Sequence, residues 1–241
     1  MIKKGISLII AICFSLMLSN ATFAATWSVH TESYLEDSSY YGARGAKGDF
    51  KLPSIDSHWT STYDENFITF EQWLYVNGTS NDWLELGYMD GAIDPENDGV
   101  REDYTGFFKA KRLGGSGGEY WESKLDKTAT VGTVYTFSIV DVNASDLWEI
   151  YIGSTYFGSF SGTITRSYDL VMDQGYEFNI EPGSTAHSRD STEITNQYYR
   201  YNGTWSPWSN LSSYVNIYNT ATSYITTVSY SSSNNKTTFT K

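Results

Sequence analysis

Apolar and polar residues alternate at every second position in several segments of this chain, which is the pattern of β-strands that bury one face. The clearest alternation runs over residues 67–76 and ends at Asn77-Gly78, a pair that favours a tight turn. A second run, 83–88, follows the turn at 77–82. We therefore predict a β-hairpin whose non-core face carries Thr69, Glu71, Trp73 and Tyr75 on one strand and Trp83, Glu85 and Gly87 on the other.

Further segments of the same kind predict strands over the rest of the chain. They lie at residues 40–50, 104–113, 133–142, 147–153, 156–160, 170–180 and in the Ser/Thr-rich tail from 213. Residues 26–39 are polar and mixed, and we predict an arm or an edge strand there. No segment after residue 24 keeps apolar residues at helical spacing for more than two turns. The pattern therefore predicts an all-β chain.

The first 24 residues have the layout of a secretory signal peptide. Lys3 and Lys4 precede an apolar run at 6–18, and small residues surround a cleavage point after Ala24. Aromatic residues make up 17% of the chain, with Ser, Thr, Asn and Gly between them, which is typical of exported many-stranded proteins. We expect a secreted protein.

The mature chain is expected to consist of an arm at 25–39 and one β-sandwich domain at 40–241. Its core must hold without disulfides, because the one cysteine, Cys13, lies in the signal segment. The formal net charge of −12 argues against nucleic acid or an anionic membrane as a partner. No later stretch has the length of apolar sequence that spans a bilayer. We expect a monomer.

Two carboxylates stand in comparable positions on separate predicted strands. Glu85 lies beside Trp83 on a non-core face, and in the 170–180 segment Glu177 and Asn179 share the face opposite Tyr176. Two carboxylates on one wall can act as acid and base, because a shared proton gives them different roles. The alternative from spacing alone is that both are solvated strand residues.

Other chemistries lack the residues that they need. His30, His58 and His187 are each isolated, so a zinc site is not expected, and thiol or serine-triad catalysis has no suitable constellation. The acidic stretch 90–103 suggests calcium, but it lacks the terminal bidentate glutamate of the helical calcium loop, and we favour a solvated loop. We expect no metal or cofactor.

Several segments follow one another in a fixed order along the chain: Tyr41-Gly42-Ala43-Arg44 before a strand that ends at Pro53, the strand 67–75, Trp83-Leu84-Glu85-Leu86-Gly87-Tyr88, the Trp-rich hairpin at 148–160 and Gly175-Tyr176-Glu177. This ordered set resembles the neprosin family of secreted glutamic peptidases. The resemblance implies an antiparallel two-sheet β-sandwich of the concanavalin-like jelly-roll type. It also implies a polypeptide substrate, acid activity and no cofactor.

The resemblance places Glu85 and Glu177 on the catalytic pair of that family. It suggests Glu177 as the base and Glu85 as its partner, and the reverse order is also open. Glu71 stands where the family has glutamine and adds a third carboxylate. Trp73, Trp83 and Tyr151 are candidates for the walls of a substrate pocket, with Asn179 beside Glu177 as a further contact.

Two other functional classes fit the same residues. A carbohydrate-binding module would stack exposed Trp and Tyr on sugar rings and would need no carboxylate pair. A glycoside hydrolase would use the two glutamates, and their separation would set its stereochemistry. A glycoside hydrolase would release oligosaccharides, whereas a peptidase would cleave peptides, so a test of both substrates distinguishes them.

Overall fold

The computed structural model describes residues 29–41, 43–75, 82–113, 119–143, 147–161, 169–181, 184, 186–208, 211–217 and 227–241. The predicted signal peptide, and the hairpin turn apart from Asp82, lie outside these residues. No helix within the described ranges has the length and apolar character that a membrane crossing requires. Regular structure there is β-strand apart from a short 3-10 helix at Ser232–Asn234.

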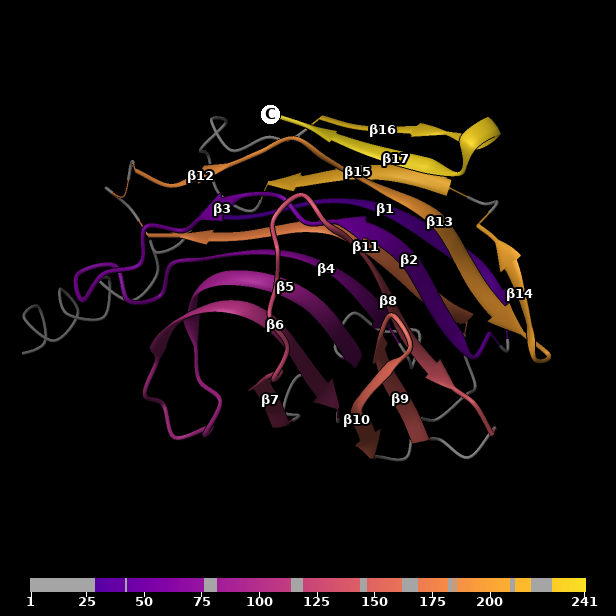
Figure 1. Cartoon of the computed structure of the whole chain (residues 1–241), viewed down its shortest axis with the longest axis horizontal. Helices are drawn as coiled ribbons and strands as arrows, with labels where there is room; N and C mark the ends of the chain where they lie inside the picture. Colours follow the sequence, from indigo (N-terminus) through magenta and orange to yellow (C-terminus); the bar gives the residue numbers. More distant parts are fainter. Residues whose placement is uncertain are drawn as a thin grey trace, which may run out of the picture.

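Two large antiparallel sheets pack against each other (Figure 1). The first contains, in spatial order, β15 (Leu211–Ile217), β1 (Val29–Tyr41), β11 (Asp169–Ile180), β4 (Phe67–Tyr75), β5 (Trp83–Ile93), β6 (Glu102–Leu113) and β7 (Glu119–Lys124). The second contains β10 (Thr155–Ser161), β9 (Leu147–Ile152), β8 (Val134–Asp141), β2 (Gly45–Lys51), β13 (Thr192–Tyr201), β17 (Lys236–Thr240) and β16 (Thr227–Ser231), with β14 (Thr204–Pro207) paired to β13. A two-stranded sheet joins β3 (Ile55–Asp56) and β12 (Ser188–Arg189). The predicted all-β antiparallel sandwich is confirmed.

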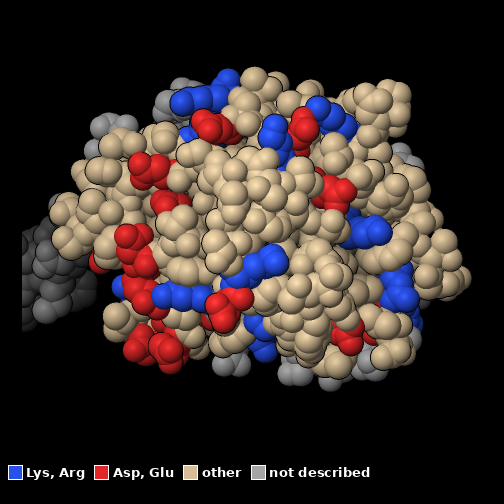
Figure 2. Space-filling view, viewed as in Figure 1, with Lys and Arg blue, Asp and Glu red and all other residues tan. Residues whose placement is uncertain are grey.

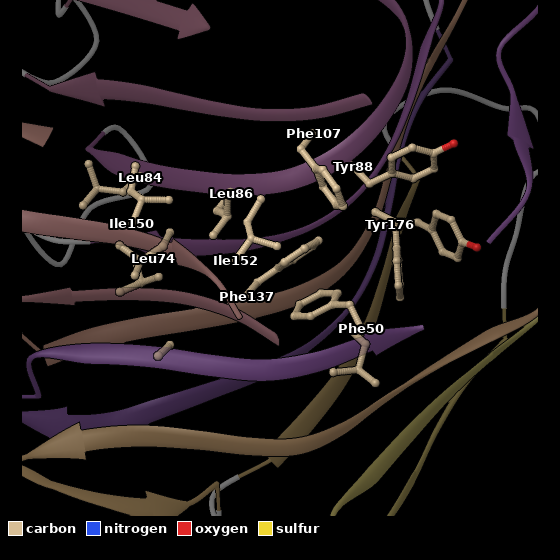
Figure 3. Close-up of a cluster of buried hydrophobic side chains, with 14 of the residues drawn as sticks. Phe50, Leu74, Leu84, Leu86, Tyr88, Phe107, Phe137, Ile150, Ile152 and Tyr176 are labelled. Atoms are coloured by element: carbon tan, nitrogen blue, oxygen red, sulfur yellow. The ribbon is translucent and has the colours of Figure 1, made fainter. Parts of the chain in front are cut away.

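Alternating side chains of the two sheets meet in one hydrophobic core (Figure 3). Phe50 of β2 packs on Phe70 of β4 with ring centroids 5.3 Å apart, and stacks on Phe137 of β8 at 4.4 Å. The opposite face of the first sheet carries a smaller apolar group that we call the outer cluster, formed by Met89, Ile93, Phe108 and Ala110. Both faces of this sheet are therefore buried around β5 and β6.

A chain of hydrogen-bonded polar side chains crosses the core between the sheets. Gln174 Nε2 donates to Gln72 Oε1 at 2.7 Å, and Gln72 Nε2 donates to the carbonyl oxygen of Ala46 at 3.1 Å. Gln197 Nε2 donates to Gln174 Oε1 at 2.9 Å, and Thr237 Oγ1 donates to Gln197 Oε1 at 2.7 Å. All four side chains are fully buried. Each of these buried side chains has hydrogen-bond partners, so the core does not pay the free-energy cost of unsatisfied polar groups.

The predicted hairpin and meander are present, whereas the N-terminal segment differs from expectation. β4 and β5 pair with Trp73 opposite Glu85, and β8, β9 and β10 follow one another in the second sheet. The segment predicted as an arm or edge strand forms β1, which is an interior strand because it pairs with both β11 and β15. Its β15 partner comes from the far end of the chain, which local alternation does not reveal.

Gln174→Leu should lower the free energy of unfolding by roughly 1–3 kcal/mol, because it leaves the Gln72 oxygen and the Gln197 amide buried without partners. Chemical denaturation measures this loss. Thr238→Val is the matched control. Thr238 follows Thr237 on β17, so its side chain points to the opposite face of the sheet, and it is only partly buried. Its effect should stay within about 0.5 kcal/mol. Equal stability of Gln174→Leu and wild type would contradict a structural role for the polar chain.

Candidate active site

Three adjacent strands of the first sheet bring three glutamates together. Glu71 lies on β4, the middle strand, opposite Gly87 of β5 on one side and Gly175 of β11 on the other. Glu85 and Glu177 are each two residues from these glycines, so both are diagonal neighbours of Glu71. Period-two alternation keeps all three side chains on the outer face of the sheet.

Glycine at position 87 makes this convergence possible. A Cβ atom there would lie 2.4 Å from the Glu71 Cβ and 2.8 Å from the Phe108 Cε1, far inside van der Waals contact. The absence of a side chain lets the Phe108 ring approach Glu71 across the gap. The Phe108 ring edge therefore lies near Glu71, which is completely buried.

One carboxylate oxygen from each of Glu71, Glu85 and Glu177 lies within 4.8 Å of the other two. Glu71 is completely buried, Glu85 is 7% exposed and Glu177 is partly buried. The structure thus brings together the two glutamates predicted as a pair, and adds Glu71 as an inner third member. We call these residues the glutamate cluster.

Two neighbouring side chains orient the glutamate cluster. Trp73 Nε1 donates a hydrogen bond of 2.6 Å to Glu85 Oε1, and the Thr69 hydroxyl donates to Glu71 Oε1. A hydrogen bond donated to a carboxylate favours its ionised form. Trp73 is itself buried, so this N–H is held in place by packing and supports a negative charge on Glu85.

Burial raises the pKa of Glu71 well above 4.5, and the negative charges of Glu85 and Glu177 raise it further. The Thr69 hydroxyl acts in the opposite direction, while a hydrogen bond between Glu71 and Glu177 again favours the protonated form. The crowding of three carboxyl groups and the burial of Glu71 favour a proton within the cluster. Glu71, the most buried member, is the preferred place for it.

The glutamate cluster opens into a pocket of about 230 Å³. Its lining combines acidic, apolar, aromatic and cationic side chains: Phe67, Thr69, Glu71, Trp83, Glu85, Met89, Ala92, Arg101, Phe108, Tyr120, Glu122 and Glu177. Tyr120 packs edge-on against Trp83 with ring centroids 5.7 Å apart and donates a hydrogen bond of 2.6 Å to Glu122. The pocket thus places proton-bearing groups beside an apolar surface.

The spacing of the three carboxylates would also suit a cation. Calcium takes about six to eight oxygen ligands, and Thr69 and Trp73 already donate to Glu71 Oε1 and Glu85 Oε1. A shared proton relieves the same repulsion and needs only two oxygens. The geometry therefore fits proton sharing more directly than a calcium site.

The structure separates the other predicted site residues. Trp83 lines the pocket, and Trp73 contacts it indirectly through Glu85. Tyr151 lies on β9 of the second sheet, where its hydroxyl donates to Glu149, so it is not a wall of this pocket. Asn179 lies further along β11 and its side chain donates to the Glu65 carbonyl at 2.8 Å, so it holds a loop instead of lining the pocket.

Several pocket residues were not predicted from the sequence. Met89 continues the alternation of Glu85 and Gly87 and could have been found from that spacing. Tyr120 and Glu122 lie on β7, a strand that we did not predict from alternation. They line the pocket because β7 pairs with β6 at the edge of the first sheet.

The acidic 90–103 segment borders the site. The Asp94 carboxylate accepts backbone hydrogen bonds from Asp98 and Gly99 at 3.1 and 2.9 Å, and the Asp94 amide donates to Glu122. Residues 96–99 of this loop are exposed. Acidic side chains gather at the left of Figure 2, the side on which Figure 1 shows the connection from β5 to β6.

Glu71→Gln should change how stability depends on pH. A carboxyl group whose folded-state pKa exceeds its unfolded value of 4.5 holds its proton more tightly when folded, so wild type loses stability as pH rises from 4.5 towards the folded-state pKa. We expect the stability of Glu71→Gln relative to wild type to increase over this interval, by at most ~1.4 kcal/mol per pH unit.

Urea denaturation at a series of pH values from about 4 to about 7 measures this difference. Glu96→Gln is the control, because Glu96 is exposed on the acidic loop. A difference between Glu71→Gln and wild type that is the same at every pH would contradict the raised pKa.

No protein-family model matches the sequence, and no curated protein matches it. Among solved structures, it is similar to scytalido-glutamic peptidase with a transition state analog inhibitor, at 13% identity and a TM-score of 0.49, over 89% of this chain and 99% of that one. It is also similar to a Bacteroides ovatus mixed linkage glucan GH16 protein, in complex with a G4G4G3G product, at 15% identity and a TM-score of 0.39, over 64% of this chain and 67% of that one. These are likenesses of fold alone.

Proposed function

We propose that this protein is a secreted, acid-active glutamic endopeptidase that hydrolyses peptide bonds with an activated water molecule. The observation that carries the proposal is the glutamate cluster, in which one carboxyl group is fully buried and two others line an open pocket. Such a site holds proton-bearing and proton-free carboxyls side by side, as general acid–base hydrolysis requires. The ordered resemblance to the neprosin family supports the choice of a peptide substrate.

The hydrogen bonds support particular roles for the two pocket glutamates. The Trp73 N–H favours ionised Glu85, which would take a proton from the attacking water. Glu177, beside Glu71, would donate its proton to the developing oxyanion and then to the leaving nitrogen. This order is the reverse of the one that the sequence resemblance first suggested, because the Trp73 contact was not evident there.

Glu71 would act by staying protonated. A neutral Glu71 can donate to Glu177 without adding a third negative charge. As pH rises, Glu177 loses its proton and the acid step fails, so activity should be confined to acidic pH. The three groups titrate together, and the limits of activity belong to the cluster rather than to single residues.

A glycoside hydrolase that uses the same pair is the second candidate. Retaining glycosidases hold two carboxyl groups about 5–5.5 Å apart, and the oxygens here lie within 4.8 Å of one another. The apolar lining from Met89, Phe108 and Ala92 supports a peptide side chain over a sugar ring, because sugar hydroxyls need polar partners. A binding module would have no use for a buried third carboxyl.

Glu85→Gln and Glu177→Gln should each reduce cleavage of a denatured protein by about 10²–10⁴-fold, because each removes one proton-transfer group. The assay incubates the purified mature protein with substrate from about pH 3 to about pH 7 and follows fragments by mass spectrometry. Glu149→Gln on the second sheet is the control. Added EDTA should leave activity unchanged. Oligosaccharide release without peptide cleavage would favour the glycosidase, and cleavage that survives both substitutions would remove the mechanism.

Glu71→Gln should keep activity within about threefold of wild type at acidic pH, because glutamine is a neutral substitute for a protonated glutamate and can still donate a hydrogen bond. The measurement is kcat/KM against pH for this variant beside the two pocket variants. Loss as large as theirs would show that Glu71 carries a proton in the reaction itself.

A further inference from the structure

We propose that the apolar end of the pocket is a subsite for one bulky apolar side chain of the peptide substrate, next to the bond that is cleaved. The inference rests on the proposed function and adds the substrate class. It starts from β5, where Glu85, Gly87 and Met89 follow one another at every second position on the same face. The strand thus presents a carboxylate, a gap and an apolar side chain in a line.

The gap connects the reacting groups to the apolar surface directly. The missing side chain of Gly87 leaves Phe108 in close approach to Glu71, as the 2.4 Å and 2.8 Å clashes of an added Cβ demonstrate. Met89 stands opposite Thr69, which holds Glu71, and Glu177 stands opposite the same threonine from the other side. The apolar surface therefore begins within one or two residues of an extended peptide bound at the glutamates, since such a chain rises about 3.4 Å per residue.

The apolar end is built rather than accidental. Met89, Ala92 and Phe108 line the pocket yet are only 2–3% exposed, and Met89 and Phe108 pack with Ile93 and Ala110 in the outer cluster. Phe67 adds a further apolar wall. A leucine or phenylalanine side chain would displace water from these surfaces, and hydrophobic pockets distinguish side chains by about tenfold or more per methylene. Gly or Ala at the same substrate position would leave the surface wet.

The test varies one residue at a time on either side of the cleaved bond of a peptide, among Gly, Ala, Leu, Phe and Lys. We expect Leu or Phe at one of these positions to raise kcat/KM at least about tenfold over Ala. Met89→Ala, which removes apolar surface from the pocket, should reduce this preference at least about tenfold. Ile93→Val is the matched control, because Ile93 belongs to the outer cluster but not to the pocket lining, and it should preserve the preference.

Binding separates this inference from the proposed function. The affinity of Leu and Ala peptides for Glu177→Gln is measured by tryptophan fluorescence, since Trp83 lines the pocket. Tighter binding of the Leu peptide by at least about tenfold supports the subsite even if wild type cleaves neither peptide. Equal affinities, or cleavage without preference, would overturn it. Cleavage of neither peptide by wild type counts against the proposed function alone.

Discussion

Burial of Glu71 between two other carboxyl groups is the constraint on which the site depends. A carboxylate removed from water beside two negative charges is strongly disfavoured, so burial and charge raise the pKa of Glu71 and favour its protonated form. That proton makes the members of the glutamate cluster unequal. Trp73 increases the inequality, because its N–H donates to Glu85 and stabilises negative charge there. The proposed acid and base roles would thus follow from differences in environment between chemically identical side chains.

The core of the sandwich holds this arrangement in register. Gln72 and Gln174 are directly opposite each other on β4 and β11, and they hydrogen-bond inside the core. Each glutamine is next in sequence to a residue of the site that lies on the opposite face of the sheet: Gln72 follows Glu71, and Gln174 precedes Gly175. A slip of one residue would turn every side chain to the opposite face. The hydrogen bond between Gln72 and Gln174 therefore also keeps Gly175 opposite Glu71.

Alternation predicted most of the strands and the faces of β4, β5 and β11, because period two is a local property of the sequence. It also placed Glu85 and Glu177 on non-core faces. Alternation failed where pairing between distant segments decides the structure. It did not show that β15 pairs with β1 and makes β1 an interior strand. It also did not show that Tyr151 lies on the second sheet, away from the glutamate cluster. The face taken to be outer is itself buried, since β6 contributes Phe108 to the outer cluster, and no local pattern reports that covering.

In the proposed peptidase, the outer cluster would link proton transfer to the choice of substrate. Phe108 approaches Glu71 across Gly87, so an apolar group that removes water from the carboxyl also forms part of the proposed subsite. A bulky apolar side chain that enters the pocket would exclude further water and favour the protonated form of Glu71 still more. Such a substrate would thus strengthen the proton distribution that the reaction needs, whereas a small one would leave water beside the carboxylates. The proposed substrate preference and the proposed acid activity would in this way be two consequences of the same packing.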